Sequence, residues 1–209
     1  MSAARGEIST ETIISDKQSR NLVYHTIKRI LDIAFALFVI IILWGVLLGA
    51  WLAVKLTSPG PGIFTQERVG KDGRPFTCYK FRTMGLGTQE ASTHEVTADS
   101  VTAVGQFLRK TKIDELPQVW NILKNELNLV GPRPCLPVQW ELVSARSELG
   151  VLGEIGGITG WALIQNVDMS NPNRLAKLDA EYLALRTIPL DLKIILAAAI
   201  GRGQGDKVK

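Results

Sequence analysis

The longest apolar run of the chain covers residues 33–54 and contains no charged side chain. As a single helix it would be about 33 Å long, enough to cross the hydrocarbon core of a bilayer. Lys28 and Arg29 precede it and Lys55 follows it, so the positive-inside rule gives no orientation. Gly45 weakens the helix near its middle. Two interpretations stay open: a helix that spans the membrane, and a re-entrant segment with both ends on the cytoplasmic side.

Two stretches that follow the apolar run predict β-strands. Residues 58–62 read Ser-Pro-Gly-Pro-Gly and end any helix. Residues 63–69 and 75–84 are rich in strand-forming side chains, and the Gly-Lys-Asp-Gly sequence at 70–73 supplies the residues that a tight turn needs. We therefore expect a β-hairpin.

The remaining apolar positions recur mostly at helical spacing. Helices are expected over residues 101–110, 115–126, 136–149, 173–186 and 190–200, and loops over 85–100 and the glycine-rich 150–160. The last helix is apolar but too short to span a bilayer, so it packs in the core or lies in the membrane interface.

These elements divide the chain into four parts. Residues 1–25 are expected to form a flexible N-terminal tail, 26–57 the membrane-embedded segment, 58–202 a water-facing domain and 203–209 a C-terminal tail. The predicted fold class is mixed α/β and rich in helices, with a β-hairpin and amphipathic helices in the domain.

Composition and charge narrow the function. The chain has 209 residues, of which 46% are apolar and 21% charged, as in a folded domain with an anchor. The net charge of +4 suits an anionic membrane surface or a phosphate-bearing substrate, whereas no zinc-finger spacing or long basic tract points to nucleic acid. The distant Cys78 and Cys135 predict reduced thiols in the cytoplasm. With two histidines, a His-based metal site or a Ser-His-Asp triad is not expected.

Residues 109–118 (RKTKIDELPQ) form the stretch richest in chemistry. Asp114 and Glu115 stand beside several cations at a predicted helix start, with Pro117 in the first turn. Asp114 can be a simple N-cap. Alternatively, one carboxylate can act as a nucleophile on phosphorus, and its neighbour can hold Mg²⁺ together with substrate phosphates.

Four cations are candidates for phosphate binding. Lys80 and Arg82 alternate along the second predicted strand, so they are expected on one face, either as ordinary surface residues or as a diphosphate site. Arg109 lies just before the two carboxylates. Arg133 stands between two prolines, and such a stiff turn suits bidentate phosphate recognition.

Seven ordered motifs resemble the monotopic phosphoglycosyl transferases, also called bacterial sugar transferases. They are 28–29 (KR), 64–70 (FTQERVG), 79–84 (YKFRTM), 114–118 (DELPQ), 128–134 (NLVGPRP), 157–161 (GITGW) and 190–194 (LDLKI). The resemblance covers residues 28–200, nearly all of the chain outside the two tails.

The resemblance implies an enzyme that transfers a sugar 1-phosphate from a UDP-sugar to undecaprenyl phosphate and releases UMP. This is the first membrane step in making bacterial glycoconjugates such as exopolysaccharide. Asp114 matches the nucleophile that forms a covalent phosphosugar intermediate, and Glu115 matches the residue that helps to bind Mg²⁺. Lys80, Arg109 and Arg133 match cations around the diphosphate and nucleotide.

The resemblance also implies a location and a topology. The membrane segment would be a re-entrant helix–break–helix in the cytoplasmic leaflet of the bacterial inner membrane, with amphipathic helices of the catalytic domain lying on the surface. Relatives carry Ser-Pro at the break, where this chain has Trp44 and Gly45. Residues 162–167 (ALIQNV) and Gly156 also depart from the family pattern.

Other functions remain open at the level of sequence. A non-catalytic membrane scaffold would use Asp114 and Glu115 only to cap a helix, and a polyprenyl-phosphate phosphatase would release phosphate in place of UMP. The sequence leaves open which UDP-sugar is used and whether the chain forms a homo-oligomer.

Overall fold

The computed structural model describes residues 10–86 and 100–201, with side chains from Asn21 onward. In chain order its elements are α1 (Thr10–Ile42), α2 (Trp44–Thr57), β1 (Ile63–Val69), η1 (Lys71–Gly73), β2 (Pro75–Phe81), α3 (Ala103–Thr111), η4 (Ile113–Gln118), α4 (Val119–Leu123), β3 (Asn128–Val130), α5 (Trp140–Glu148), η5 (Val151–Gly153), β4 (Gly157–Thr159), α6 (Trp161–Ile164), α7 (Pro172–Leu185) and α8 (Ile188–Ala199), where η denotes a 3-10 helix.

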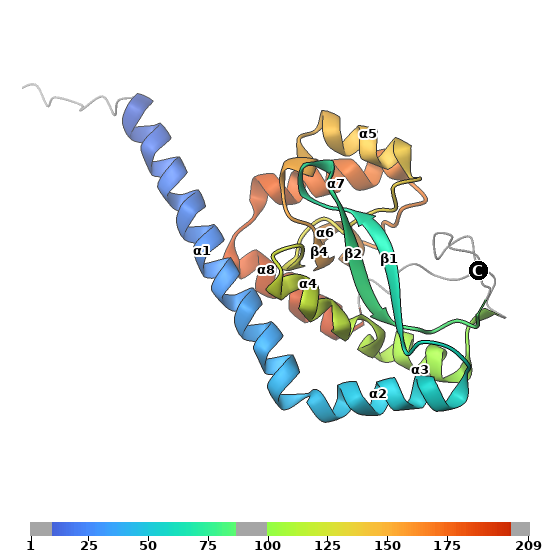
Figure 1. Cartoon of the computed structure of the whole chain (residues 1–209). Helices are drawn as coiled ribbons and strands as arrows, with labels where there is room; N and C mark the ends of the chain where they lie inside the picture. Colours follow the sequence, from blue (N-terminus) through green and yellow to red (C-terminus); the bar gives the residue numbers. More distant parts are fainter. Residues whose placement is uncertain (1–9, 87–99, 202–209) are drawn as a thin grey trace, which may run out of the picture.

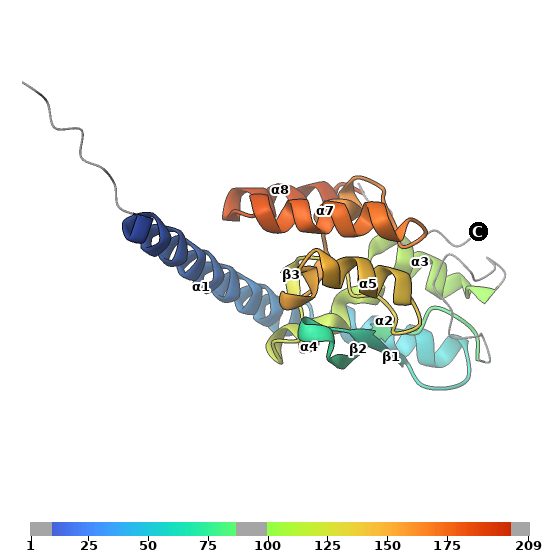
Figure 2. The ribbon, with the colours of Figure 1, turned by 90° about the horizontal axis from the view of Figure 1, so that it is seen from above.

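The consecutive helices α1 and α2 meet at an angle and lie along the edge of a small domain (Figure 1). Seen from above, α7 and α8 lie along one side of this domain and the hairpin along the other, with α5 between them (Figure 2). The helix-rich mixed α/β fold expected from the sequence is thereby confirmed.

The predicted hairpin is present. β1 pairs with β2 in antiparallel register, from Ile63 opposite Phe81 to Val69 opposite Pro75. The turn is a 3-10 segment in which Asp72 has a positive φ of 56°, a conformation that aspartate tolerates better than most residues. β2 ends at Phe81, three residues before the end that we predicted at residue 84.

The glycine-rich stretch 150–160 is not the plain loop that we expected. It contains η5 and β4, and β4 pairs in parallel with β3. A Cβ added at Gly157 would lie 2.1 Å from the backbone N of Gly131, and one at Gly160 would lie 2.3 Å from the carbonyl oxygen of Gly131. These glycines therefore allow two backbone segments to approach closely. In the sequence they resemble loop residues, which is why irregular structure is expected there.

The inner faces of α1 and α2 pack on the domain, whereas their outer faces are apolar and exposed. Ala36 and Val39 of α1 are buried in one cluster with residues of α4, and Ala50 and Val54 of α2 in another with Phe81 of β2. Large apolar side chains exposed on α1 and α2 from residue 30 onward are Ile30, Leu31, Leu37, Phe38, Ile41, Ile42, Trp44, Val46, Leu48, Trp51, Leu52 and Leu56. An apolar surface of this extent marks contact with a membrane or a partner.

No single helix among the described residues is long and apolar enough to cross a bilayer, but residues 21–42 and α2 pass that test as a pair bent by 67°. The bend lies at Leu43, one residue before the Trp44–Gly45 site where we expected a break. Gly45 itself lies inside α2. The bend is therefore not at the glycine.

The predicted basic flanks of the apolar segment are part of the fold. The Lys28 ammonium donates to Asp191 of α8 at 2.9 Å, and both side chains are buried. Arg29 donates to the carbonyl oxygens of Ile122 and Leu123 at the end of α4. These cations lock α1 to the domain, so they are not the solvated charges that the positive-inside rule counts.

The start of α1 differs from our expectation of a flexible tail over residues 1–25. The helix begins at Thr10. The Tyr24 hydroxyl donates to Asp191 at 3.0 Å and lies 3.2 Å from the Tyr182 hydroxyl. Part of the expected tail thus belongs to the folded protein, because polar side chains of α1 find partners on α7 and α8.

The helices predicted over 101–110, 136–149, 173–186 and 190–200 are present with shifted ends, whereas the one predicted over 115–126 is divided into η4 and the short α4. The helix expected over residues 136–149 begins only at Trp140. α8 begins at Ile188, with Pro189 in its first turn and the Thr187 side chain accepting from the Leu190 N–H. Proline is favoured in that position, so it starts the helix that we had placed after it.

Candidate active site

Asp114 and Glu115 lie in η4 and not at the start of a regular α-helix. We expected one helix over residues 115–126 with Asp114 as its N-cap. Instead Lys112 adopts a left-handed φ of 60° at the end of α3, and η4 follows before α4 begins. Pro117 lies inside η4, where it has no N–H to donate to a preceding carbonyl. Asp114 and Glu115 are consequently both presented by one tight turn.

The Glu115 carboxylate is held between two of the predicted cations. Its Oε1 accepts from Arg133 Nη2 at 2.5 Å and from Lys80 Nζ at 3.2 Å. The nearby guanidinium and ammonium groups overcome the cost of burial and hold the pKa of Glu115 well below its ordinary value. Glu115 is therefore ionised and fixed in position.

The Asp114 carboxylate has the opposite character. The residue is only 8% exposed, and its Oδ1 has no hydrogen-bond partner among the described residues. Burial and the neighbouring Glu115 charge raise its pKa to about 6, against the attraction of Lys80, Arg109 and Arg133. A buried oxygen left unsatisfied in this way is high in free energy and is suited to react or to bind a ligand.

A buried asparagine fixes the strand that carries Lys80. Asn121 of α4 is fully buried, accepts from the Tyr79 N–H at 3.2 Å and donates to the Thr77 carbonyl oxygen at 2.7 Å. It thereby binds the free edge of β2 to the segment that follows η4. The sequence shows Asn121 only as a polar residue on a predicted amphipathic helix, so its role was missed.

Arg133 is positioned through both its side chain and its backbone. Its Nη1 donates to the carbonyl oxygen of Ile158 in β4 at 2.9 Å. Its own carbonyl oxygen accepts from Arg146 Nη1 of α5 at 2.9 Å, and Arg146 forms a buried ion pair with Asp179 of α7 at 2.7 Å. The sequence predicted a stiff arginine here but not the Arg146–Asp179 pair, which no local pattern signals.

Arg109 belongs to the same site, at the last turn of α3. Its Nε donates to the Thr83 hydroxyl at 2.9 Å, and its charge lowers the pKa of Asp114. A Cβ added at Gly105 would lie 2.0 Å from the Thr83 carbonyl oxygen. Only glycine allows α3 to lie this close, so Gly105 helps to bring Arg109 to the carboxylates.

Arg82 does not join this group of side chains. Its guanidinium donates to three backbone carbonyl oxygens in the turn after α2, those of Ser58, Pro59 and Pro61, at 2.7 to 3.0 Å. The side chain is buried there. Arg82 therefore fixes the turn that follows α2. Its position does not support the expectation that it shares a face and a substrate with Lys80.

The two carboxylates fit a divalent cation that is completed by a substrate. Groups of three or more His, Cys, Asp or Glu side chains that could hold a metal are absent among residues 10–86 and 100–201. Mg²⁺ is commonly bound by one or two carboxylates plus substrate phosphates. The ionised Glu115 carboxylate beside the cations that would bind the substrate phosphates fits that pattern.

Three other buried polar atoms near the site lack a partner within the described parts of the chain. They are Gln118 Nε2, Thr159 Oγ1 and Trp161 Nε1. Gln118 shares η4 with Asp114, and Thr159 pairs with β3 next to the Arg133 turn. All three stand in motifs that the sequence singled out, although no role was assigned to them.

The family model for bacterial sugar transferases matches residues 23–202 of the chain. This range contains every side chain of the site described above.

Named relatives agree with the family match. The chain is 38% identical over 175 residues to the uncharacterized sugar transferase EpsL of Bacillus subtilis, covering 81% of this chain and 83% of the relative. It is 36% identical to UDP-glucose:undecaprenyl-phosphate glucose-1-phosphate transferases of Caulobacter vibrioides and Escherichia coli, covering 81% of this chain in both comparisons. The match spans 67% of the Caulobacter protein and 38% of the Escherichia coli protein. The chain belongs to the bacterial sugar transferase family, and the prediction of a sugar phosphotransferase is confirmed.

Proposed function

We propose that this protein transfers a sugar 1-phosphate from a UDP-sugar to undecaprenyl phosphate and releases UMP. The observation that carries the proposal is the buried Asp114 carboxylate, whose Oδ1 has no partner among the described residues. The positive charges of Lys80, Arg109 and Arg133 each act to lower its pKa. Together with Glu115 these residues carry three positive and two negative charges, an excess that suits a diphosphate.

In the first step the ionised Asp114 attacks the β-phosphorus of the UDP-sugar. A bond forms between the carboxylate oxygen and this phosphorus. The bond from the phosphorus to the oxygen that bridges the two phosphates breaks, and UMP leaves with that oxygen and its electron pair. The fixed Arg133 and Lys80 and the nearby Arg109 bind and orient the diphosphate, because phosphoryl transfer depends chiefly on positioning and charge neutralisation.

In the second step a phosphate oxygen of undecaprenyl phosphate attacks the same phosphorus. The bond to Asp114 breaks, the carboxylate is restored, and the product is a sugar joined to the lipid through a diphosphate. Two successive displacements let a water-soluble donor and a lipid acceptor use one site in turn.

Glu115 would hold Mg²⁺ together with the phosphate oxygens of the donor, and the cation would neutralise charge on the leaving nucleotide. Lys80 and Arg133 keep Glu115 ionised and fixed, so this carboxylate is preorganised as a ligand. Asp114 remains available for bond formation.

The donor half-reaction tests this proposal directly. Purified protein without acceptor is incubated with Mg²⁺ and a panel of UDP-glucose, UDP-galactose and UDP-N-acetylgalactosamine. We expect about one UMP per protein with the correct donor, a phosphosugar adduct on the peptide that contains Asp114, and loss of both with EDTA. Release of inorganic phosphate without UMP would indicate a phosphatase, and no turnover with any donor would favour a non-catalytic scaffold.

We further propose that the bent pair is re-entrant and lies in the cytoplasmic leaflet of the bacterial inner membrane. α2 has 14 residues and is about 21 Å long, less than the hydrocarbon core. Both ends of the apolar segment contact the same domain, through Lys28 to Asp191 and through the Ser58 carbonyl oxygen to Arg82. This arrangement supports two ends on one side of the membrane.

The topology is tested by fusing a reporter to each end of the chain in bacterial cells. We expect both ends in the cytoplasm. A cysteine-labelling reagent that does not cross the inner membrane should therefore leave both fused ends unlabelled. A cytoplasmic cysteine control and a periplasmic one calibrate the labelling. Labelling of either fused end from the periplasm would show that the segment spans the membrane.

A further inference from the structure

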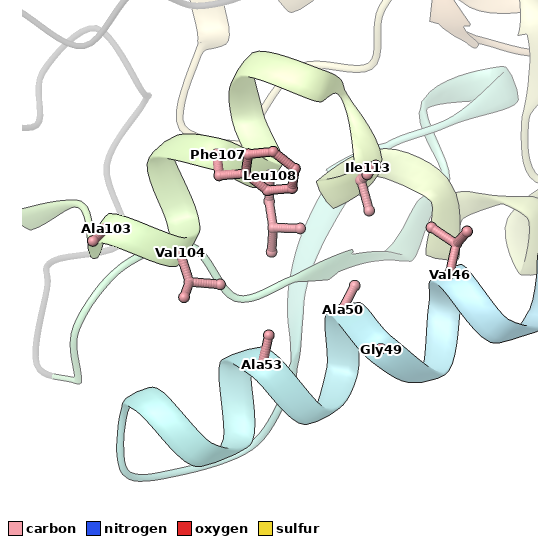
Figure 3. Close-up of a pocket in the computed structure, with 9 residues that line it drawn as sticks. All are labelled: Val46, Gly49, Ala50, Ala53, Ala103, Val104, Phe107, Leu108 and Ile113. Carbon is pink, nitrogen blue, oxygen red and sulfur yellow. The ribbon is translucent and has the colours of Figure 1, made fainter.

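An apolar groove runs between α2 and α3, with a volume of about 500 Å³ (Figure 3). This volume lies in the range typical of small-molecule sites. Its lining contains no charged side chain and consists of Val46, Gly49, Ala50, Ala53, Ala103, Val104, Phe107, Leu108 and Ile113. Side chains of α2 point toward those of α3 and Ile113 across the groove. Glycine and alanine on α2 keep the space between the two helices open.

Two residues that line the groove are chain neighbours of the reactive groups. Ile113 lines it and is bonded to Asp114, and Leu108 lines it and is bonded to Arg109. Successive Cα atoms are about 3.8 Å apart. The elements that line the groove, α3 and η4, thus also carry Arg109 and Asp114, within one residue of the lining.

The other side of the groove faces the apolar exterior. Val46 is 42% exposed and Phe107 60% exposed. α2 belongs to the bent apolar pair that meets the composition and length test for membrane segments. A hydrocarbon chain can thus enter from the lipid phase without crossing water.

We propose that this groove binds the first isoprene units of the polyprenyl phosphate acceptor, an inference that rests on the proposed function. The apolar lining and the adjacent charges together match a ligand with one branched hydrocarbon chain joined directly to a monophosphate. In a phospholipid, a glycerol group separates the acyl chains from the phosphate. An acyl chain that reached Ile113 would therefore hold its phosphate away from Asp114.

The test fills the groove without touching the reactive groups. A Cβ at Gly49 meets no atom within 4 Å, so Gly49→Leu places a side chain in open space. Gly45 has equal room in the same helix but does not line the groove, so Gly45→Leu is the matched control. We expect Gly49→Leu to slow transfer from the phosphosugar intermediate to undecaprenyl phosphate by about tenfold or more, with UMP release in the first half-reaction unchanged.

Each result decides the proposal. An unchanged acceptor step in Gly49→Leu, an equal loss in Gly45→Leu, or a loss confined to UMP release would overturn it. Absence of UMP release in the parent protein would instead overturn the proposed function.

In the parent protein, a polyprenyl phosphate with a diazirine on an early isoprene unit should label residues 46–53 or 103–113, whether or not the variants fold. Labelling elsewhere, or labelling of the groove by a diazirine phosphatidylglycerol that undecaprenyl phosphate does not displace, would contradict it.

Discussion

Asp114→Asn is expected to reduce UMP release from the correct UDP-sugar by at least about a thousandfold, because the amide cannot form the covalent intermediate. The protein should remain folded, since asparagine has nearly the shape of the carboxyl group. The measurements are single-turnover UMP release and the mass of the phosphosugar adduct. Asp72→Asn changes the same chemical group in the exposed hairpin turn and should leave both unchanged.

The same substitution should stabilise the metal-free protein at neutral pH. The pKa of Asp114 rises from 3.8 to about 6 on folding. The folded state therefore binds the proton more tightly, and this contribution to stability is present below pH 3.8 and is lost as the pH rises through about 6. Asparagine avoids the loss, so the variant should gain about 1 to 3 kcal/mol over the parent above pH 6 and little below pH 4.

Denaturant unfolding in EDTA between pH 4 and pH 8 measures this gain. An equal stability difference at all pH values would show that the effect has another origin. Full catalytic activity of Asp114→Asn would exclude Asp114 as the nucleophile. A stabilising change that removes activity is the pattern expected when a reactive group is held in an unfavourable environment.

Local sequence signals were sufficient for the hairpin, for most helices and for nominating the two candidate carboxylates. Asp114 and Glu115 are adjacent in one motif, so the sequence nominates both, and η4 holds both in one turn. Lys80 and Arg133 come from distant segments, yet the motifs nominated both and the structure places both on Glu115. The family resemblance supplied this grouping, which periodicity alone does not.

The failures arise where distant backbone groups decide the outcome. Arg82 and Lys80 look alike on an alternating strand, but three carbonyl oxygens in the turn at 58–61 bind Arg82. The parallel pair of β3 and β4 has three residues per strand, and glycines that look like loop residues allow its close approach. Such features depend on contacts between segments that no single window of sequence contains.

The buried pair of Arg146 and Asp179 is expected to have the largest effect on stability. Asp179→Ala leaves the Arg146 guanidinium buried without its carboxylate, and the cost should be about 3 to 5 kcal/mol in the free energy of unfolding. Replacing both residues, as Arg146→Met with Asp179→Leu, should restore much of the stability, because an apolar pair of similar volume carries no unpaired charge. Denaturant unfolding of the single and double variants measures both effects.

The pair should also affect the donor step through Arg133. Arg146→Lys keeps an ion pair with Asp179 within reach but removes the fork that also donates to the Arg133 carbonyl oxygen. We expect the KM for the UDP-sugar to rise by about threefold to tenfold, a coupling of about 1 kcal/mol. In an Arg133→Ala background the same change should have almost no effect, because the side chain that it positions is gone. Additive effects in this double-mutant cycle would show that Arg146 acts on the site by another route.

The Arg146→Met, Asp179→Leu variant separates stability from donor binding. It should be stable, but its KM for the UDP-sugar should stay high, because different bonds of the Arg146 guanidinium stabilise the fold and position Arg133.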